Sequence, residues 1–464
     1  MFERELIGVL GLVVLFALLV LRVPVALAMI AVGVGGNYAL SLVVPFLRFE
    51  PYLKQFKTLL WGTVSNYDLS VVPLFILMGY LASHASLSRD LFQGFNALVG
   101  RLRGGVAMAA IAACAGFGAV CGSSLATAST MGRVALPELD RLRYAPRLST
   151  GTLAAGGTLG ILIPPSVALV IYAIIVEASI IEMFQAAVIP GLIAVAFFIG
   201  VIAISVRMYP ELAPESQSMS DTERRVAIRR LIPVLLIFGA IILGLGLGLF
   251  TPTPAAAIGA TVILLYGVFL RWVNPNEGLS RSGFAESVLS TATTAGMIYL
   301  ILFGAEVLKG FFARAGLPAA LASWTTGSGL DPWLLLILLL LMLILLGCFM
   351  DSLAMILVVV PFFWPALVEL NGGDYATAAT AAYGMSTDEL KIWFGIIALV
   401  VVELGLITPP VGLNVFIISA MAKDVRMGDV FVGVMPFFTV ELLRIVLLLA
   451  VPGLCLFLPS VLSG

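Results

Sequence analysis

Long apolar runs recur along the whole chain and are separated by short segments that carry most of its charges. Examples of such runs are residues 7–21, 232–250, 334–346 and 396–402. A helix needs about 20 mainly apolar residues to cross a bilayer, and these runs are continuous rather than alternating with a period of two. The pattern therefore predicts an all-α polytopic membrane protein. We expect the first spanning helix over residues 6–36 and do not expect it to be a cleavable signal.

The composition supports this class. Of 464 residues, 61% are hydrophobic and only 11% are charged, whereas a soluble domain carries about 25% charged residues. The net charge of −1 and the lack of a basic tail make nucleic acid an unexpected partner. One histidine, His84, and four cysteines without paired spacing predict no transition-metal site. The sequence has no Walker loop and no GxSxG motif, so we expect neither an enzyme nor an organic cofactor.

Charged residues divide the chain. The longest polar segment, residues 209–230, is rich in arginine, and arginine in short loops marks the cytoplasmic side of a membrane. This rule places the segment in the cytoplasm and the N-terminus outside. The expected organisation is N-terminal scaffold helices over 1–66, a first repeat over 67–208, a cytoplasmic linker with scaffold helices over 209–285, a second repeat over 286–427 and a C-terminal helix over 428–464.

Related motifs occupy corresponding places in the two halves. In the first half, a small-residue segment at 122–127 precedes a proline pair, and in the second half residues 349–354 do the same. Such correspondence predicts an internal structural repeat. The second half has a longer spacing between its two motifs, and the polar stretch 371–388 accounts for the difference as a surface insertion.

The proline pairs Pro164–Pro165 and Pro409–Pro410 interrupt two apolar segments that are otherwise long enough to span a membrane. Proline lacks a backbone donor and pushes its predecessor out of helical geometry, so each pair is expected to break its helix. The resulting arms are too short to cross the bilayer. We therefore predict re-entrant hairpins over about 149–178 and about 392–422, whose tips meet near the midplane.

The ends of broken helices suggest ligands. The last carbonyl groups of the first arms suit a hard cation such as sodium, and the first N–H groups of the second arms suit a carboxylate. Asp351 adds a charge, and Glu403 could orient the second tip. Glu441 and Arg444, three residues apart, are expected to form a local ion pair. For the small residues, close helix packing remains an alternative role.

Four segments carry a family resemblance, namely residues 73–79, 122–127, 154–166 and 403–414. At these segments the sequence resembles the large membrane subunit of tripartite ATP-independent periplasmic (TRAP) transporters. The resemblance covers nearly the whole chain. It implies an elevator-type fold with two inverted repeats, each containing a re-entrant helical hairpin, on a scaffold domain.

The resemblance also implies a function and partners. It suggests sodium-coupled import of a small organic anion across the bacterial inner membrane, with Na⁺ as the coupling ion. The implied partners are a small four-helix membrane subunit on a separate chain, a periplasmic substrate-binding protein and the lipid bilayer. A stand-alone carboxylate symporter and a channel remain as alternatives. Pro254 occupies a position where the family commonly has an acidic residue.

The motif match and the helix-end argument together give the candidate site residues. Those expected to bind sodium are Ser123, Ser124, Thr127, Gly160, Asp351, Ser352, Gly405 and Thr408. Those expected to bind the substrate are Thr158, Pro164, Pro165, Ser166, Pro409, Pro410, Gly412 and Asn414.

Overall fold

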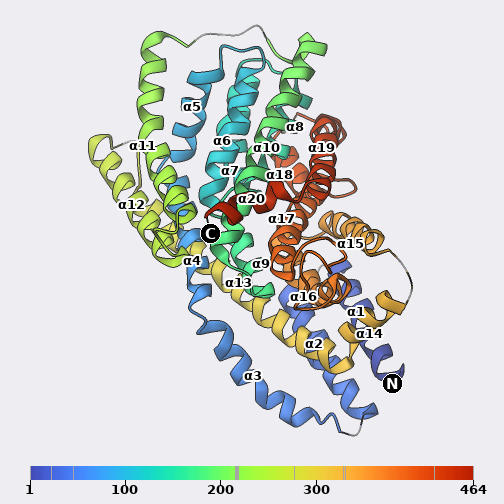
Figure 1. The fold of residues 1–464 in the computed structure, drawn as a ribbon. Helices are drawn as coiled ribbons and strands as arrows, with labels where there is room; N and C mark the ends of the chain where they lie inside the picture. Colours follow the sequence, from blue (N-terminus) through green and yellow to red (C-terminus); the bar gives the residue numbers. More distant parts are fainter. Residues whose placement is uncertain are drawn as a thin grey trace.

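Figure 1 shows the computed structural model, in which most of the described chain is helical. The structure describes residues 2–462 except Arg22, Pro45, 215–218, Asn276, Ser328, Leu330 and Lys423. By length and composition, seven of the described helices can cross a membrane, or up to nine spans if each of two bent helix pairs counts as one. The prediction of an all-α polytopic membrane protein is confirmed.

The N-terminal region does not contain the single helix expected over residues 6–36. Its elements are α1 (Phe2–Val20), α2 (Val25–Val43), α3 (Phe49–Val64), η1 (Asp68–Ser70) and α4 (Val71–His84). The expectation is wrong because the chain turns between α1 and α2, which then pack against each other. Pro24 explains the turn, since it cannot donate a helical hydrogen bond and instead stands at the N-cap of α2.

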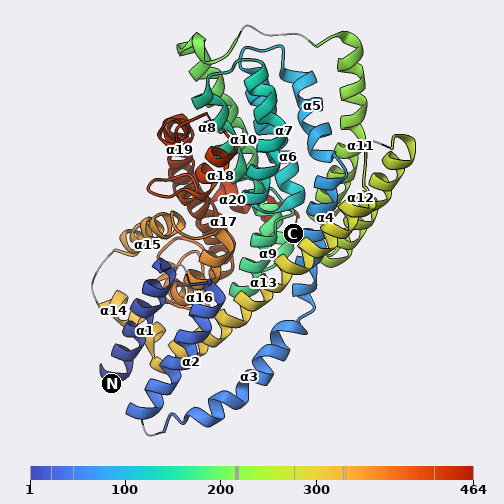
Figure 2. The same cartoon turned by 180° about the vertical axis from the view of Figure 1, so that it is seen from behind.

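The first half of the molecule continues with six helices. They are α5 (Leu87–Val99), α6 (Gly105–Cys121), α7 (Ser124–Arg141), α8 (Pro146–Leu162), α9 (Val167–Val176) and α10 (Ile180–Met208). Only Gly122 and Ser123 separate α6 from α7, and the two helices lie side by side and pack on α8 (Figures 1 and 2).

A set of long helices joins the halves. After η2 (Pro210–Leu212), the structure has α11 (Asp221–Gly246), α12 (Pro252–Val273), α13 (Arg281–Ala315) and α14 (Leu317–Gly327). Much of the segment expected as a polar linker over 209–230 is thus helical, and residues 215–218 within it lie outside the described chain. The boundary expected at 285/286 falls inside α13, a continuous helix of 35 residues that packs along α2 and α4.

The second half contains α15 (Pro332–Gly347), α16 (Ser352–Asn371), α17 (Thr387–Gly405), α18 (Leu413–Met421), α19 (Met427–Ala450) and α20 (Gly453–Leu462). The C-terminal region therefore has two helices rather than the one expected over 428–464, because Pro452 interrupts the chain between them. The polar stretch expected as an insertion is the connection from α16 to α17. The Asn371 amide holds it by donating to Met385 O at 3.0 Å and accepting from Tyr383 N at 3.2 Å.

The chain folds back at different points from those predicted. Both proline pairs do break their helices, since α8 ends at Leu162 and α17 ends at Gly405. However, α8 and α9 meet at a bend of only 44°, and α18 packs on α7, α8 and α19 rather than along α17. The hairpins expected over 149–178 and 392–422 are therefore broken helices. The hairpins whose tips reach these breaks are instead α6–α7 and α15–α16, which precede the broken helices in the chain.

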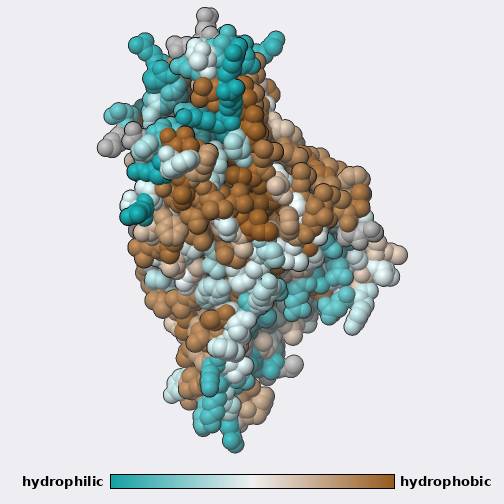
Figure 3. Space-filling view, turned by 90° about the vertical axis from the view of Figure 1, so that its left-hand side faces the viewer, coloured by the Kyte–Doolittle hydropathy of each residue, from teal (hydrophilic) through white to brown (hydrophobic). Residues whose placement is uncertain are grey.

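The outer surface fits a bilayer. Figure 3 shows hydrophilic residues gathered at the top and bottom of the view, with a broad hydrophobic surface between them. On α11 and α12, large side chains such as Leu236 and Leu265 are about two-thirds exposed. Side chains of this kind are expected to face lipid.

Candidate functional site

The tip of the first hairpin lies against the break between α8 and α9. Gly122 ends α6 with a φ of +60°, and a Cβ atom there would lie 3.0 Å from Val167 N, at the start of α9. Ser123 then caps α7 by accepting a hydrogen bond from Ala126 N at 3.4 Å. One turn before the tip, α6 crosses α8 so closely that a Cβ on Gly118 would lie 2.5 Å from the Cα atom of Gly160.

The second half repeats this arrangement. Here α15 crosses α17 at Gly347, where a Cβ on Gly405 would lie 2.6 Å from the Cα atom of Gly347. The tip that follows approaches the second proline pair, since the Cys348 thiol donates to Pro409 O at 3.5 Å. Asp351 caps α16 and accepts a hydrogen bond from Leu353 N at 3.2 Å. In both halves, a glycine crossing therefore places a hairpin tip beside a helix break.

Glu403 connects the two hairpins. Its carboxylate is 1% exposed and lies on the last turn of α17. Ser124, the first residue of α7, donates to Oε2 at 2.5 Å, and Ser352, the first residue of α16, donates to Oε1 at 2.6 Å. Sequence analysis suggests a role for Glu403 at the second tip only. The contact with Ser124 gives it a place at both tips.

Two other polar atoms of the predicted site are buried without a hydrogen-bond partner among the described residues. They are Thr127 Oγ1 and Asn414 Oδ1. The Thr127 oxygen lies beside Gly160, where a Cβ would come within 2.5 Å of it. Asn414 lies in the first turn of α18, and its amide nitrogen donates to Ala154 O of α8 at 3.3 Å. Such unpaired acceptors at helix ends are available to a ligand.

Several of the predicted site residues already form hydrogen bonds with backbone groups of their own segments. The hydroxyl of Thr158 donates to Ala155 O and that of Thr408 donates to Leu404 O, each at 2.6 Å. Ser166 caps α9 by accepting from Leu169 N at 3.4 Å. Gly412, with a φ of +61°, precedes α18.

The two proline pairs differ in exposure. Both the Pro164–Pro165 and Pro409–Pro410 peptide bonds are cis. The first pair is buried, whereas the second is exposed. The first break is thus covered by the rest of the chain, whereas the second lies at the surface of this subunit.

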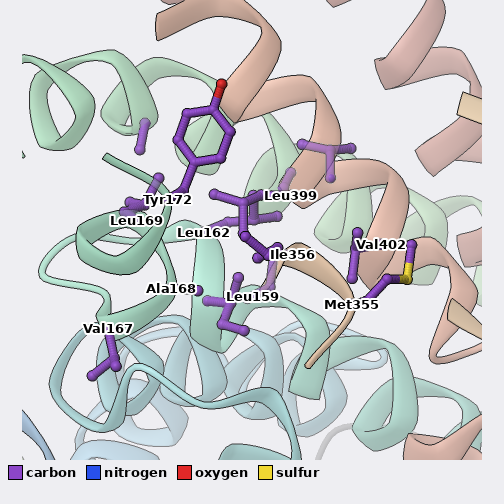
Figure 4. Close-up of a cluster of buried hydrophobic side chains, with 14 of the residues drawn as sticks. Leu159, Leu162, Val167, Ala168, Leu169, Tyr172, Met355, Ile356, Leu399 and Val402 are labelled. Atoms are coloured by element: carbon purple, nitrogen blue, oxygen red, sulfur yellow. The ribbon is translucent and has the colours of Figure 1, made fainter. Parts of the chain in front are cut away.

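A dry layer holds the broken helices together. Figure 4 shows Leu159 and Leu162 of α8 near Ile356 of α16, with Tyr172 of α9 and Leu399 of α17 around them. All five side chains are no more than 1% exposed. This layer fixes elements of both halves in one packed unit beside the polar tips.

The fold and the buried centre define a class of protein: an α-helical membrane transporter whose two halves each combine a hairpin with a broken helix. Within this class, the chain belongs to the family described as "Tripartite ATP-independent periplasmic transporter, DctM component", whose sequence model matches residues 12–454. It is therefore a transporter subunit rather than an enzyme, and a multi-pass protein of the bacterial inner membrane. This agrees with the predicted family, class and location.

Relatives are similar over most of their length. The C4-dicarboxylate TRAP transporter large permease protein DctM of Pseudomonas aeruginosa is 32% identical over 91% of this chain and 94% of that protein. The sialic acid TRAP transporter large permease protein SiaM of Vibrio cholerae is 30% identical over 87% and 88%. The isethionate TRAP transporter permease protein DctMQ of Oleidesulfovibrio alaskensis is 27% identical over 95% of this chain and 65% of that protein.

Solved structures share the fold at low identity. The YdaH transporter of Alcanivorax borkumensis has a TM-score of 0.56 at 17% identity and covers 87% of this chain and 89% of its own. MtrF of Neisseria gonorrhoeae has a TM-score of 0.52 at 14% identity over 86% and 83%. At these identities the likeness concerns the fold alone.

Proposed function

We propose that the chain is the membrane subunit of a sodium-coupled importer for a small organic anion of the carboxylate or sulfonate class. The observation that carries the proposal is the meeting of two hairpin tips and two helix breaks around a buried polar centre. Helix C-termini present carbonyl oxygens and helix N-termini present N–H groups, so one centre can hold a cation and an anion together. The names of the relatives, which refer to C4-dicarboxylates, sialic acid and isethionate, support this cargo class.

In this proposal sodium binds at both tips. At the first tip, the unpaired hydroxyl oxygen of Thr127 lies beside Gly160, and Ser123 and Ser124 start the next helix. At the second tip, Asp351 supplies a carboxylate beside Ser352, near Gly405 and Thr408. Neutral oxygens with a nearby carboxylate are ligands that suit a hard cation.

The anion then lies between the breaks. The unpaired amide oxygen of Asn414 accepts hydrogen bonds but cannot donate them, so the proposal assigns the recognition of a carboxylate to backbone N–H groups near Ser166 and Gly412. Access runs past the exposed Pro409–Pro410.

The remaining parts of the proposal concern movement and partners. The packed unit of broken helices and hairpins moves as an elevator against the N-terminal helices and α13. A periplasmic binding protein delivers the cargo, and a small four-helix membrane subunit braces the scaffold, as the family's tripartite description supports.

Uptake by purified components tests the proposal. Proteoliposomes containing this chain with its small subunit and binding protein should accumulate a labelled organic anion only when sodium is higher outside. A panel of a C4-dicarboxylate, a sialic acid and a sulfonate identifies the cargo. Accumulation with a potassium gradient in place of sodium would contradict the coupling. Equal uptake by this chain alone would favour the stand-alone symporter instead, and flux without any cation gradient would favour a channel.

A further inference from the structure

Glu403 is the shared acceptor of two hydroxyl groups that lie far apart in sequence. Ser124 is 279 residues away and Ser352 is 51 residues away, yet each occupies one oxygen of the same carboxylate. Each serine is the first residue of the helix that leaves a hairpin tip. We propose that Glu403 is a positioning residue that links the two tips, so that the two sodium sites fill cooperatively. The inference rests on the proposed sodium coupling.

The hydrogen bonds to Glu403 set the orientation of each serine hydroxyl group. A serine hydroxyl has one hydrogen and two lone pairs. When the hydrogen points at Glu403, the lone pairs point elsewhere and remain available to a cation. The Glu403 side chain therefore orients both serine oxygens without binding an ion itself.

The surroundings of Glu403 hold it in place. It lies two residues before Gly405, at the close crossing with Gly347. No basic side chain forms an ion pair with it within the described chain. Its acidic neighbours are Asp351 at the second tip and Glu441, which is paired with Arg444. A displacement of one serine that keeps its hydrogen bond must shift the shared carboxyl group, and this shift reaches the other serine. Two sites that affect each other in this way are coupled reciprocally.

The test is the sodium dependence of uptake by the complete complex in proteoliposomes. With Glu403→Gln, one serine loses its acceptor, because an amide offers one oxygen that accepts and one NH2 group that only donates. We expect the Hill coefficient for sodium to fall toward 1 and the half-saturating sodium concentration to rise at least about fivefold. The KM for the organic anion at saturating sodium should stay within about twofold, which a general structural defect would not produce. Glu286→Gln, at an exposed position of α13, is the matched control.

Further variants keep the test decisive if Glu403→Gln folds poorly. Ser124→Ala and Ser352→Ala should each lower the Hill coefficient for sodium. In the Glu403→Gln background, each serine substitution should lower it by less than it does in the unaltered protein. Glu403→Asp keeps the charge but is one methylene shorter, so it should lose cooperativity as well. Retained cooperativity in Glu403→Asp would assign the effect to charge and overturn the positioning role.

Two results would reject the inference in different ways. If uptake by the unaltered complex does not depend on sodium, the proposed function fails and the inference fails with it. If that uptake does depend on sodium but Glu403→Gln and both serine variants leave the sodium curve unchanged, only the link between the tips is overturned.

Discussion

At the scale of single residues, some buried polar groups are paired with residues far away in the sequence, and others with residues close by. Glu441 and Arg444 are of the second kind. They lie one helical turn apart on α19, both less than 5% exposed, and form the ion pair that sequence analysis predicts. Arg444 also donates to Pro190 O of α10 at 3.1 Å, which ties the two helices together.

Replacing one partner of this ion pair should lower the free energy of unfolding much more than replacing both. Arg444→Met leaves the Glu441 carboxylate buried and unpaired, and we expect a loss of about 3–5 kcal/mol of stability. The double variant Glu441→Leu/Arg444→Met should recover most of that loss. Thermal unfolding of the protein in detergent measures both. A double variant no more stable than Arg444→Met would contradict the role of the pair.

At the scale of elements, the two glycine crossings set where the hairpin tips lie. Gly118 on Gly160 and Gly347 on Gly405 bring backbones together without intervening side chains. Since each crossing lies within one turn of a tip, it also fixes the tip against the neighbouring break.

A methyl group at a crossing should therefore push the helices apart. We expect Gly118→Ala to destabilise the protein by about 1–3 kcal/mol, because the added carbon would meet backbone rather than a movable side chain. Gly200→Ala is the control: it lies in the interior of α10 with open space around its Cβ position, so it should be neutral or slightly stabilising. Equal melting temperatures for the two variants would rule out the close crossing.

The sequence predicts where helices break but not where the chain folds back. The proline pairs explain both breaks locally. The direction of the chain after a break depends instead on the surface against which the next helix packs, and α9 packs against α16 and α17. The real fold-back at Gly122–Ser123 has a local signal: a glycine with positive φ followed by a serine N-cap. At the site, the sequence identifies Ser124, Ser352 and Asp351 as candidate residues. The link through Glu403 is not, because it depends on contacts across 279 residues.

At the scale of the whole molecule, the fold has two polar ends. The N-terminus and the start of α11 lie at opposite ends of the molecule (Figures 1 and 2). The arginines at the start of α11 predict that this end faces the cytoplasm. The N-terminus is then periplasmic, on the side where a binding protein would dock.

Cysteine labelling in intact cells tests this orientation. In a background without the four native cysteines, Glu5→Cys should react with a membrane-impermeant maleimide in intact cells. Thr222→Cys, near the start of α11, should react only after the cells are permeabilised. The reverse pattern would invert the topology and would place the binding protein on the other end of the molecule.

The central claim is that sodium and cargo bind where two hairpin tips meet two helix breaks. The most direct measurement is a high-resolution cryo-electron microscopy comparison of the complex in sodium and in choline. We predict density beside Thr127 and Gly160 and beside Asp351 and Gly405 in sodium, and its loss in choline. Sodium-dependent density found only elsewhere in the molecule would contradict the account.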